Sequence, residues 1–282
     1  MKLKHLPHCI ALATGLFAAQ HAAAEGGPLL WQNNSLSALY GENFDGLNFN
    51  AEEQDEQATL TFEHASGWVW GDIFAFYDYV DADNLQSRTG DFGNEKDNFY
   101  YMEINPRVSL SWLTGEKLAV GPVKDVLAAF VYEHGNGGAG TENYLYGVGV
   151  DWDVPGFAFL QTNLYHVKIN NNVFFADPSS NGDAVQLTVA GAYPFALGNQ
   201  DFVIDGYVDW RSPSEDAGSQ TSVGSSIQVK WDAGKALFGE GKKLYVGTEL
   251  NMWHNKYGAK PFDGSEDGFD QTAMQALVKY HF

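Results

Sequence analysis

The last eleven residues, 272–282, read TAMQALVKYHF. Apolar or aromatic side chains occupy every second position: Met274, Ala276, Val278, Tyr280 and Phe282. Gln275, Lys279 and His281 alternate with them, and Leu277 is the exception. A period of two is that of an extended strand whose two faces meet different surroundings. We therefore predict a final strand with one face toward an apolar medium and the other toward water.

The same alternation recurs along the chain in segments separated by clusters of Gly, Asn, Asp and Ser. We count twelve of them, at 35–41, 57–64, 71–80, 99–110, 123–133, 143–152, 157–168, 183–193, 201–210, 221–232, 244–254 and 272–282. An even count suits a closed bacterial barrel with both chain ends on the periplasmic side. We predict an all-β fold, a single antiparallel transmembrane β-barrel of about 12 strands that spans residues 25–282.

The first 24 residues have the pattern of a cleaved signal peptide. Lys2 and Lys4 precede an apolar run at 10–19, and the small residues 22–24 fit a cleavage site after Ala24. The run is shorter than the roughly 20 residues of a membrane-spanning helix. Cleavage would remove Cys9, the only cysteine, and would change the formal charge from −20 to −22 by removing two lysines. A mature chain with this negative charge would repel nucleic acid. Without Cys9 it would also have no thiol nucleophile.

The connections between the predicted strands alternate in length. The first, third and later odd ones are mostly long and acidic, at 42–56, 81–98, 134–142, 169–182, 211–220 and 255–271. Tight turns such as 153–156 and 194–199 occur among the even ones, so the odd connections are expected outside the cell. Two even connections, 111–122 and 233–243, are longer than this pattern favours. The oxygen-rich run 263–267 lacks a full Ca²⁺-loop spacing, so we expect a solvated loop, no metal and no cofactor.

Charged residues fall in the middle of the polar stripes, where a membrane barrel would place them in a wet lumen. A soluble barrel or sandwich would show the same alternation with its apolar stripe inside. The candidates for the lumen and substrate path are Glu63, Phe99, Tyr101, Glu103, Arg107, Asp205, Tyr207, Asp209, Glu249, Asn251, Trp253 and Lys279. Lys230 belongs to the same polar stripes. Aromatic residues near strand ends favour lipid–water girdles: Trp68, Trp70, Tyr77, Tyr79, Trp152, Trp210, Trp231 and Trp253.

One stretch resembles a known family. Residues 99–110, FYYMEINPRVSL, followed by Leu113-Thr114 and 118–125, are similar to the most recognisable segment of the Tsx-like nucleoside-specific channels of the outer membrane, which include OmpK relatives. The segment 76–81 and the C-terminal segment 278–282 are also similar to this family, although Asp78 stands where the family has Gly. The similarity is strongest over residues 58–152. It implies a twelve-stranded barrel for passive diffusion of nucleosides or similar small polar solutes.

The resemblance also implies that Glu103 and Arg107 face the lumen. They lie four residues apart on one strand, about 13 Å, which is too far for a direct ion pair. Each is therefore expected to pair with a neighbouring strand, and both pore bracing and ligand contact stay open as roles. The terminal Tyr280 and Phe282 resemble the signal that the outer-membrane barrel-assembly machinery reads.

Two other functions are open. The acidic loops could make the chain a surface receptor or structural barrel that binds phage or colicin, a use for which the family is known. A barrel enzyme would need a nucleophile, a base and an orienting group within hydrogen-bond reach. No HExxH or GxSxG motif occurs, and the mature histidines (His64, His134, His166, His254 and His281) form no readable catalytic pattern. We therefore expect an outer-membrane channel whose partners are the lipid bilayer and small polar solutes, and not an enzyme.

Overall fold

A computed structural model describes residues 27–44, 55–82, 98–137, 140–171, 181–259 and 269–282. The predicted signal peptide and the acidic run 263–267 lie outside these ranges. Twelve antiparallel strands form one closed barrel in which each strand pairs with its sequence neighbours and the first pairs with the last. The strands are β1 (Leu29–Phe44), β2 (Asp55–Trp68), β3 (Gly71–Ala82), β4 (Asn98–Ser109), β5 (Val123–Gly135), β6 (Thr141–Trp152), β7 (Phe159–Asn171), β8 (Gly182–Leu197), β9 (Gln200–Arg211), β10 (Ser222–Asp232), β11 (Leu244–His254) and β12 (Gln271–His281). The predicted fold class is confirmed.

Most strand bounds lie within three residues of the predicted segments, with three larger differences. β2 ends at Trp68, four residues later than predicted. β1 begins at Leu29, six residues earlier than predicted, and β8 runs on to Leu197 through the segment predicted as a turn. Pro194 lies beyond Ala192, the last residue of β8 that pairs with β7, so β8 has only β9 as a neighbour there and proline is tolerated as on an edge strand. No helix in the described part of the chain is long and apolar enough to span a membrane.

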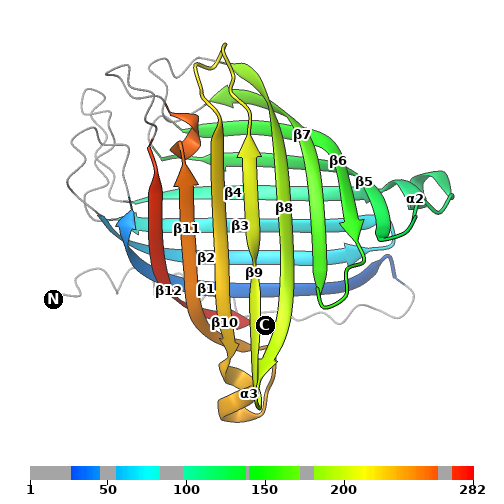
Figure 1. Cartoon of the computed structure of the whole chain (residues 1–282), viewed down its shortest axis with the longest axis vertical. Coiled ribbons are helices and arrows are strands. Elements are labelled where there is room, and N and C mark those ends of the chain that lie inside the picture. The colour runs from blue at the N-terminus through cyan, green and yellow to red at the C-terminus, as the bar shows by residue number, and fades with distance from the viewer. Residues whose placement is uncertain (1–26, 45–54, 83–97, 138–139, 172–180, 260–268) are drawn as a thin grey trace.

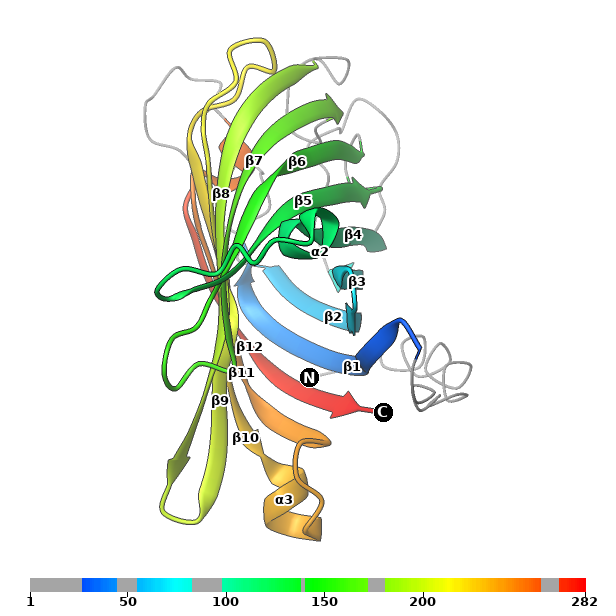
Figure 2. The same cartoon turned by 90° about the vertical axis from the view of Figure 1, so that its right-hand side faces the viewer.

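The strands are strongly tilted, so that the wall β8–β11 crosses the opposite wall β1–β4 at a steep angle (Figure 1). We call the end where β1 begins and β12 ends the terminal end, and the other the loop end. Two short helices lie at separate points of the terminal end (Figures 1 and 2): α2 (Leu110–Thr114) follows β4, and α3 (Ala233–Phe238) follows β10. These helices account for the unusual length of the connections 111–122 and 233–243.

Ion pairs between strands that are not neighbours show which face of the sheet is interior. Arg107 of β4 reaches Asp151 of β6 across the intervening β5, and Lys279 of β12 reaches Glu63 of β2 across β1. Such pairs can form only inside a closed barrel. On β12, Lys279 and Leu277 therefore point inward, while Met274, Val278 and Tyr280 point outward and are exposed.

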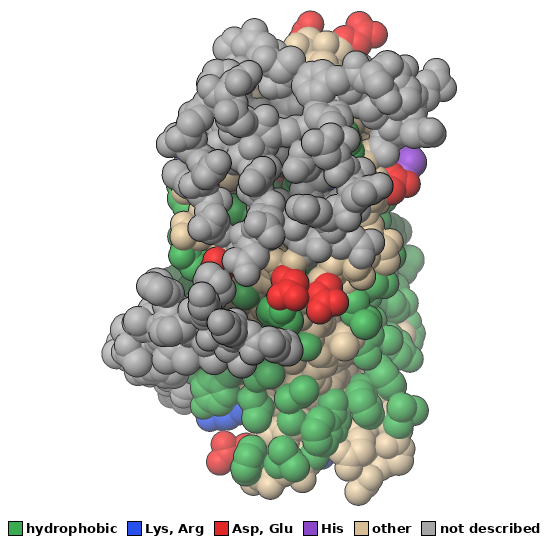
Figure 3. Space-filling model, turned by 90° about the vertical axis from the view of Figure 1, so that its left-hand side faces the viewer, with side chains coloured by type: hydrophobic (Ala, Val, Ile, Leu, Met, Phe, Trp, Pro, Cys, Tyr) green, Lys and Arg blue, Asp and Glu red, His purple; other side chains and the backbone are tan. Residues whose placement is uncertain are grey.

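The outer wall is apolar. Large exposed side chains at outward positions include Ile104, Phe130, Val148, Leu164, Val189, Ile204, Val229, Val246, Met274 and Val278. Figure 3 shows hydrophobic side chains spread over the lower part of one such face. Toward the loop end, outward rings stack in a row from Tyr77 through Tyr100 to His134 (centroids 5.5 and 5.7 Å apart), as in a lipid–water girdle. Trp253, which was also predicted for a girdle, lies instead inside the barrel, opposite Gly224.

Part of the interior is packed with apolar side chains, which the sequence analysis did not predict. This interior apolar cluster faces inward from β5, β6, β7 and β8 and from the β9–β10 connection; it comprises Ala129, Val131, Leu145, Tyr165, Val167, Ile169, Ala184 and Ala217. We call the side of the interior along β5–β8, which carries this cluster, the packed side, and the side along the remaining strands the polar side. β5–β8 also turn polar side chains inward, among them Asp151 and Thr188.

Replacement of a cluster residue should destabilise the barrel. Leu145 is almost completely buried, so we expect Leu145→Ala to lower the free energy of unfolding by about 2–4 kcal/mol, since a cavity is left among fixed neighbours. Denaturant unfolding in lipid vesicles measures this. Leu197→Ala, at the exposed β8–β9 hairpin, is the matched control and should change stability far less. Equal effects of the two substitutions would show that the cluster does not support the fold.

Candidate solute path in the barrel interior

The twelve residues proposed from sequence for the lumen all occupy inward register positions. Each pairs across its ladder with other inward residues, as Glu63 does with Phe76 and Asp205 with Gln228. The structure groups them with inward residues that were not singled out from the sequence: Asp72, Phe74, Phe76, Asp78, Glu133, Asp151, Gln186, Thr188 and Arg211. The alternation of β3 and β6 could have indicated several of them.

Arg107 is the centre of a charge cluster in the terminal half of the barrel. Its guanidinium donates to both oxygens of Asp72 on β3 (2.9 and 2.6 Å) and to Asp151 on β6 (2.9 Å). The side chain is only 4% exposed. The expectation that Arg107 pairs with a neighbouring strand is thus confirmed, and its bidentate geometry fits a bracing role.

A second charge cluster lies on the strands from β9 to β2. Lys230 donates to Asp205 (2.6 Å) and to Gln228 (2.7 Å). Lys279 pairs with Glu63, which also accepts a hydrogen bond from Ser35 (2.9 Å). Two cations and two carboxylates therefore balance each other on this wall.

One ion pair bridges the lumen in its loop-end half. Arg211 at the end of β9 donates to Glu133 near the end of β5 (2.7 Å), although three strands separate them in the barrel. Arg211 also donates to Gln186 (2.7 Å), and Asn143 donates to Glu133 (2.6 Å). The two residues flank β6–β8, which carry most of the interior apolar cluster, so the bridge lies along the border between the packed side and the polar side.

Several inward carboxylates receive hydrogen bonds from neutral donors. Glu103 accepts from Tyr101 (2.8 Å) and Asn105 (3.2 Å), and Glu249 accepts from Gln228 (2.7 Å) and Gln275 (3.0 Å). Two further inward carboxylates also accept from neutral donors: Asp78 from Thr61 (2.6 Å) and Asp209 from Thr188 (2.5 Å). The expectation that Glu103 pairs with a neighbouring strand is therefore wrong, because both of its hydrogen bonds come from β4, its own strand. The carboxylates of these four residues keep oxygen lone pairs that can accept hydrogen bonds from other donors.

Aromatic rings line the same side of the lumen. Phe74, Phe76 and Tyr101 form a continuous row on β3 and β4, with neighbouring centroids 6.0 and 5.8 Å apart. Trp253 of β11 packs against Tyr257 (4.7 Å), which belongs to the 3₁₀ turn η1 (Lys256–Gly258). A Cβ at position 224 would lie 2.6 Å from the Trp253 ring, so Gly224 provides the space for it.

The η1 turn is held at the loop end by the β9–β10 connection. Gln220 donates its backbone N–H to Gly258 (2.9 Å) and its side chain to Ala259 (2.7 Å), and Asn255 donates to Thr221 (2.8 Å). Burial of its hydroxyl and the charge of Asp78 raise the pKa of Tyr257 to about 12. The Tyr257 hydroxyl thus stays protonated at neutral pH.

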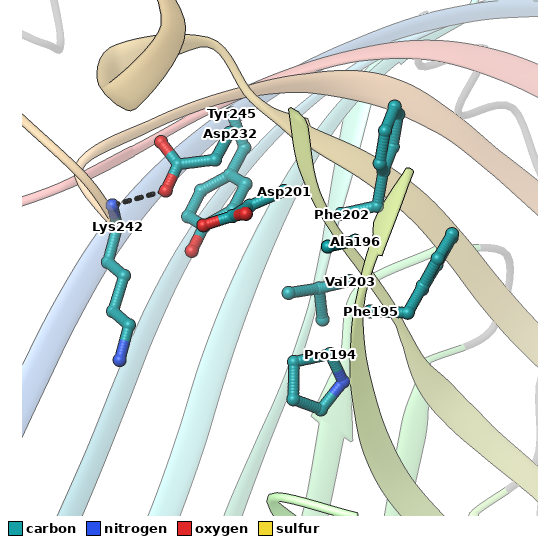
Figure 4. A pocket seen from close by; sticks show the side chains of 9 residues that line it. All are labelled: Pro194, Phe195, Ala196, Asp201, Phe202, Val203, Asp232, Lys242 and Tyr245. Atoms are coloured by element: carbon teal, nitrogen blue, oxygen red, sulfur yellow. Dashed lines mark hydrogen bonds between the residues drawn. The ribbon is translucent and has the colours of Figure 1, made fainter. Parts of the chain in front are cut away.

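The terminal end opens in a hollow of about 320 Å³ between the β8–β9 hairpin and the start of α3. Figure 4 shows Tyr245 and Asp201 beside each other at this hollow and Asp232 bonded to the backbone of Lys242 (2.7 Å). Pro194 and Val203 line the opposite side, and Phe195 and Phe202 point away together. This hollow at the terminal end therefore carries two carboxylates and an amine.

Comparison with known proteins places this interior in a family. The family described as nucleoside-specific channel-forming protein, Tsx, matches residues 33–282. The chain belongs to the Tsx family. The outer membrane protein OmpK of Vibrio parahaemolyticus is 29% identical over 263 residues, which cover 88% of this chain and 92% of that protein. The nucleoside-specific channel-forming protein Tsx of Salmonella typhimurium is 29% identical over 211 residues, 67% of this chain and 72% of its own.

Among solved structures, a NanC porin superposes with a TM-score of 0.51 at 9% identity, over 87% of this chain and 98% of the porin, which supports the barrel fold alone. Membership of the Tsx family makes the chain an outer-membrane channel for small polar solutes, as the sequence resemblance implied. Its matching relatives are channel and outer-membrane proteins and not enzymes.

Three hydrogen-bonded side chains on β1 and β2 are of the residue types found in a catalytic triad. On the outer wall of β2, His64 contacts Ser66 (2.9 Å) and Asn34 (2.8 Å). This Ser–His–Asn arrangement has no local sequence pattern because Asn34 lies on another strand, β1. Ser66 is 0% exposed, and its oxygen also accepts the indole N–H of Trp68 (2.9 Å). A substrate carbonyl cannot reach the Ser66 oxygen. The three side chains therefore serve as hydrogen-bond partners for one another on an apolar wall.

Proposed function

We propose that this Tsx-family channel conducts nucleosides along the polar side of its lumen. The observation that carries the proposal is the placement of an aromatic row, Phe74–Phe76–Tyr101, beside carboxylates whose described partners are neutral donors. A nucleoside has one flat, stackable part and one part rich in hydroxyl groups. The two kinds of lining residue match these two parts.

The packed side restricts where a solute can pass. The interior apolar cluster fills the space along β5–β8, and the Glu133–Arg211 bridge lies at its border. A solute is therefore directed toward β1–β4 and β9–β12, which carry the aromatic row and Trp253. In this narrowed space a planar base can lie against rings instead of diffusing through bulk water.

Each lining group has a defined part in the proposed passage. Rings of the aromatic row stack on the base, an interaction that tolerates different bases because each has a π-face. Glu103 and Glu249 accept hydrogen bonds from ribose hydroxyls, since each already holds only neutral donors among the described residues. The Arg107 and Lys230 clusters are internally paired and brace the wall. A chain of weak contacts of this kind allows entry and release of the solute.

Ion current through single channels in planar bilayers tests the proposal, because a nucleoside in the lumen blocks the current. We expect concentration-dependent block of the wild type by adenosine, and a block constant weakened about tenfold in Phe76→Ala, since loss of one stacking ring costs about 1–3 kcal/mol. Phe130→Ala, on the lipid-facing wall of β5, is the control and should leave block unchanged. Absence of block in the wild type, at normal conductance, would refute nucleoside passage.

Four further points from the sequence stand as proposals. We propose cleavage after Ala24, a periplasmic position for the terminal end, insertion by the barrel-assembly machinery through Tyr280 and Phe282, and docking of phage or colicin at the loop end. Both residues lie at the end of the seam between β12 and β1, where Tyr280 pairs with Leu36 and Phe282 donates its backbone N–H to Asn34 (3.0 Å). Removal of Phe282 should reduce the amount of folded protein in outer-membrane fractions; an unchanged amount would argue against the assembly signal.

A further inference from the structure

The two helices of the terminal end expose large apolar side chains. In α2, Trp112 and Leu113 are 52% and 63% exposed, and in α3, Leu237 and Phe238 are 62% and 69% exposed. No residue of α2 is buried, and in α3 only Ala233 and Gly234 are. Connections that simply face water do not need such residues, and contiguous exposed apolar surface marks an interaction site.

These side chains are held in place by a fixed scaffold. Asp125 of β5 accepts hydrogen bonds from Ser109 (2.5 Å) and Ser111 (2.6 Å), and Ser109 caps α2 by accepting from the Trp112 N–H (3.1 Å). In α3, Asp232 accepts from the backbone N–H groups of Lys235 (2.9 Å) and Lys242 (2.7 Å). The exposed apolar groups are therefore part of an ordered rim and not of a frayed connection.

Lysines accompany both helices in an otherwise acidic protein. Lys117 follows α2, and Lys242 and Lys243 follow α3; all three are exposed. Among the described residues, none forms an ion pair with these three side chains. Lysine stems can lie along apolar surface while the ammonium group reaches the lipid headgroups. Apolar groups with adjacent lysines are the combination that suits the boundary of an anionic bilayer.

We propose that α2 and α3 are interfacial anchors, in which the four apolar side chains enter the phospholipid leaflet at the terminal end and Lys117, Lys242 and Lys243 bind anionic headgroups. The patches are continuous with an established lipid interface, because both helices directly extend strands whose outer faces contact the membrane. Tryptophan at position 112 suits the same boundary. The two anchors lie at separate points of the rim and so restrict tilting of the barrel (Figure 2).

Site-specific fluorescence tests the apolar part. The only cysteine is Cys9, so single cysteines at other positions of the chain cleaved after Ala24 can be labelled selectively. Barrels carrying Leu113→Cys or Phe238→Cys are placed in vesicles of phosphatidylethanolamine and phosphatidylglycerol. Glu116→Cys and Glu240→Cys, in the same two connections, are the matched controls. We expect labels at 113 and 238 to be quenched by nitroxide lipids and protected several-fold from aqueous iodide relative to the controls. Equal iodide quenching at all four positions would overturn the proposal, including the case in which a protein partner normally covers the helices.

Lipid selectivity tests the charged part. The triple variant Lys117→Gln, Lys242→Gln and Lys243→Gln should lose the preference of the barrel for spin-labelled phosphatidylglycerol over phosphatidylcholine. Lys168→Gln, on the outer wall of β7 near the loop end, should keep that preference. A preference that is absent in the wild type, or unchanged in the triple variant, would overturn the assignment of headgroup binding to these lysines.

Discussion

Replacement of Arg107 by Met is expected to lower the free energy of unfolding by about 3 kcal/mol. Arg107 is almost fully buried and is the shared cation of Asp72 and Asp151. Its removal leaves two carboxylates close together without a positive charge, and breaking such a buried pair costs about 3–5 kcal/mol. The lower end of that range applies because both carboxylates are about one-quarter exposed to lumen water.

Denaturant unfolding in vesicles measures the effect, with two controls. Lys168→Met removes a cation from the exposed pair with Asp183, and we expect little or no change in stability because solvent screens this pair. The triple variant Arg107→Met, Asp72→Asn and Asp151→Asn should recover much of the lost stability, because no unpaired carboxylate remains. Stability of Arg107→Met equal to that of the wild type would show that the cluster does not brace the barrel.

Single-channel conductance should rise several-fold when the bridge across the lumen is removed. Glu133 and Arg211 meet from strands on different walls and set the border of the polar side. Arg211→Met or Glu133→Gln breaks the ion pair, so the side chains can withdraw toward their own strands and the passage widens. We expect the same change to weaken block by nucleosides, since a wider path holds a base less firmly against the aromatic row.

A double-mutant cycle distinguishes loss of the bridge from loss of charge. Both single variants and the double variant should show the same increase in conductance, because each removes one shared interaction. Lys168→Met changes the charge on the outer wall by the same amount as Arg211→Met and should leave conductance unaltered. Additive changes in the cycle, or a decrease in Arg211→Met, would contradict the role of the bridge.

Strand positions and inward parity could be predicted where the two faces of a strand differ in polarity. In β12, β4 and β9 charged residues alternate with apolar ones, and burial of a charge in lipid is costly enough to decide the orientation. In β5, β6 and β7 both faces are apolar: Val131, Leu145 and Val167 point inward while Phe130, Tyr146 and Leu164 point outward. Alternation alone does not show which face of these strands points inward, so the packed side of the lumen could not be predicted from the sequence.

Ion-pair partners on distant strands could not be predicted from the sequence, for a different physical reason. Whether Glu133 meets Arg211 depends on the shear of the closed barrel and on how far it is flattened, which no local pattern encodes. The same holds for Asp151, which reaches Arg107 over an intervening strand. The expected separation of Glu103 and Arg107 along β4 did follow from strand geometry, but the neutral partners of Glu103 did not. Short helices such as α3 also lack the periodic length that would mark them in sequence.

Uptake of radiolabelled nucleoside into proteoliposomes tests the central claim most directly. The claim is that the polar side of the lumen is a nucleoside path. At low external concentration, adenosine should enter vesicles containing the channel much faster than a neutral sugar of similar mass, and unlabelled nucleoside should compete for its entry. Equal rates for the two solutes without competition would show a general pore and contradict the account.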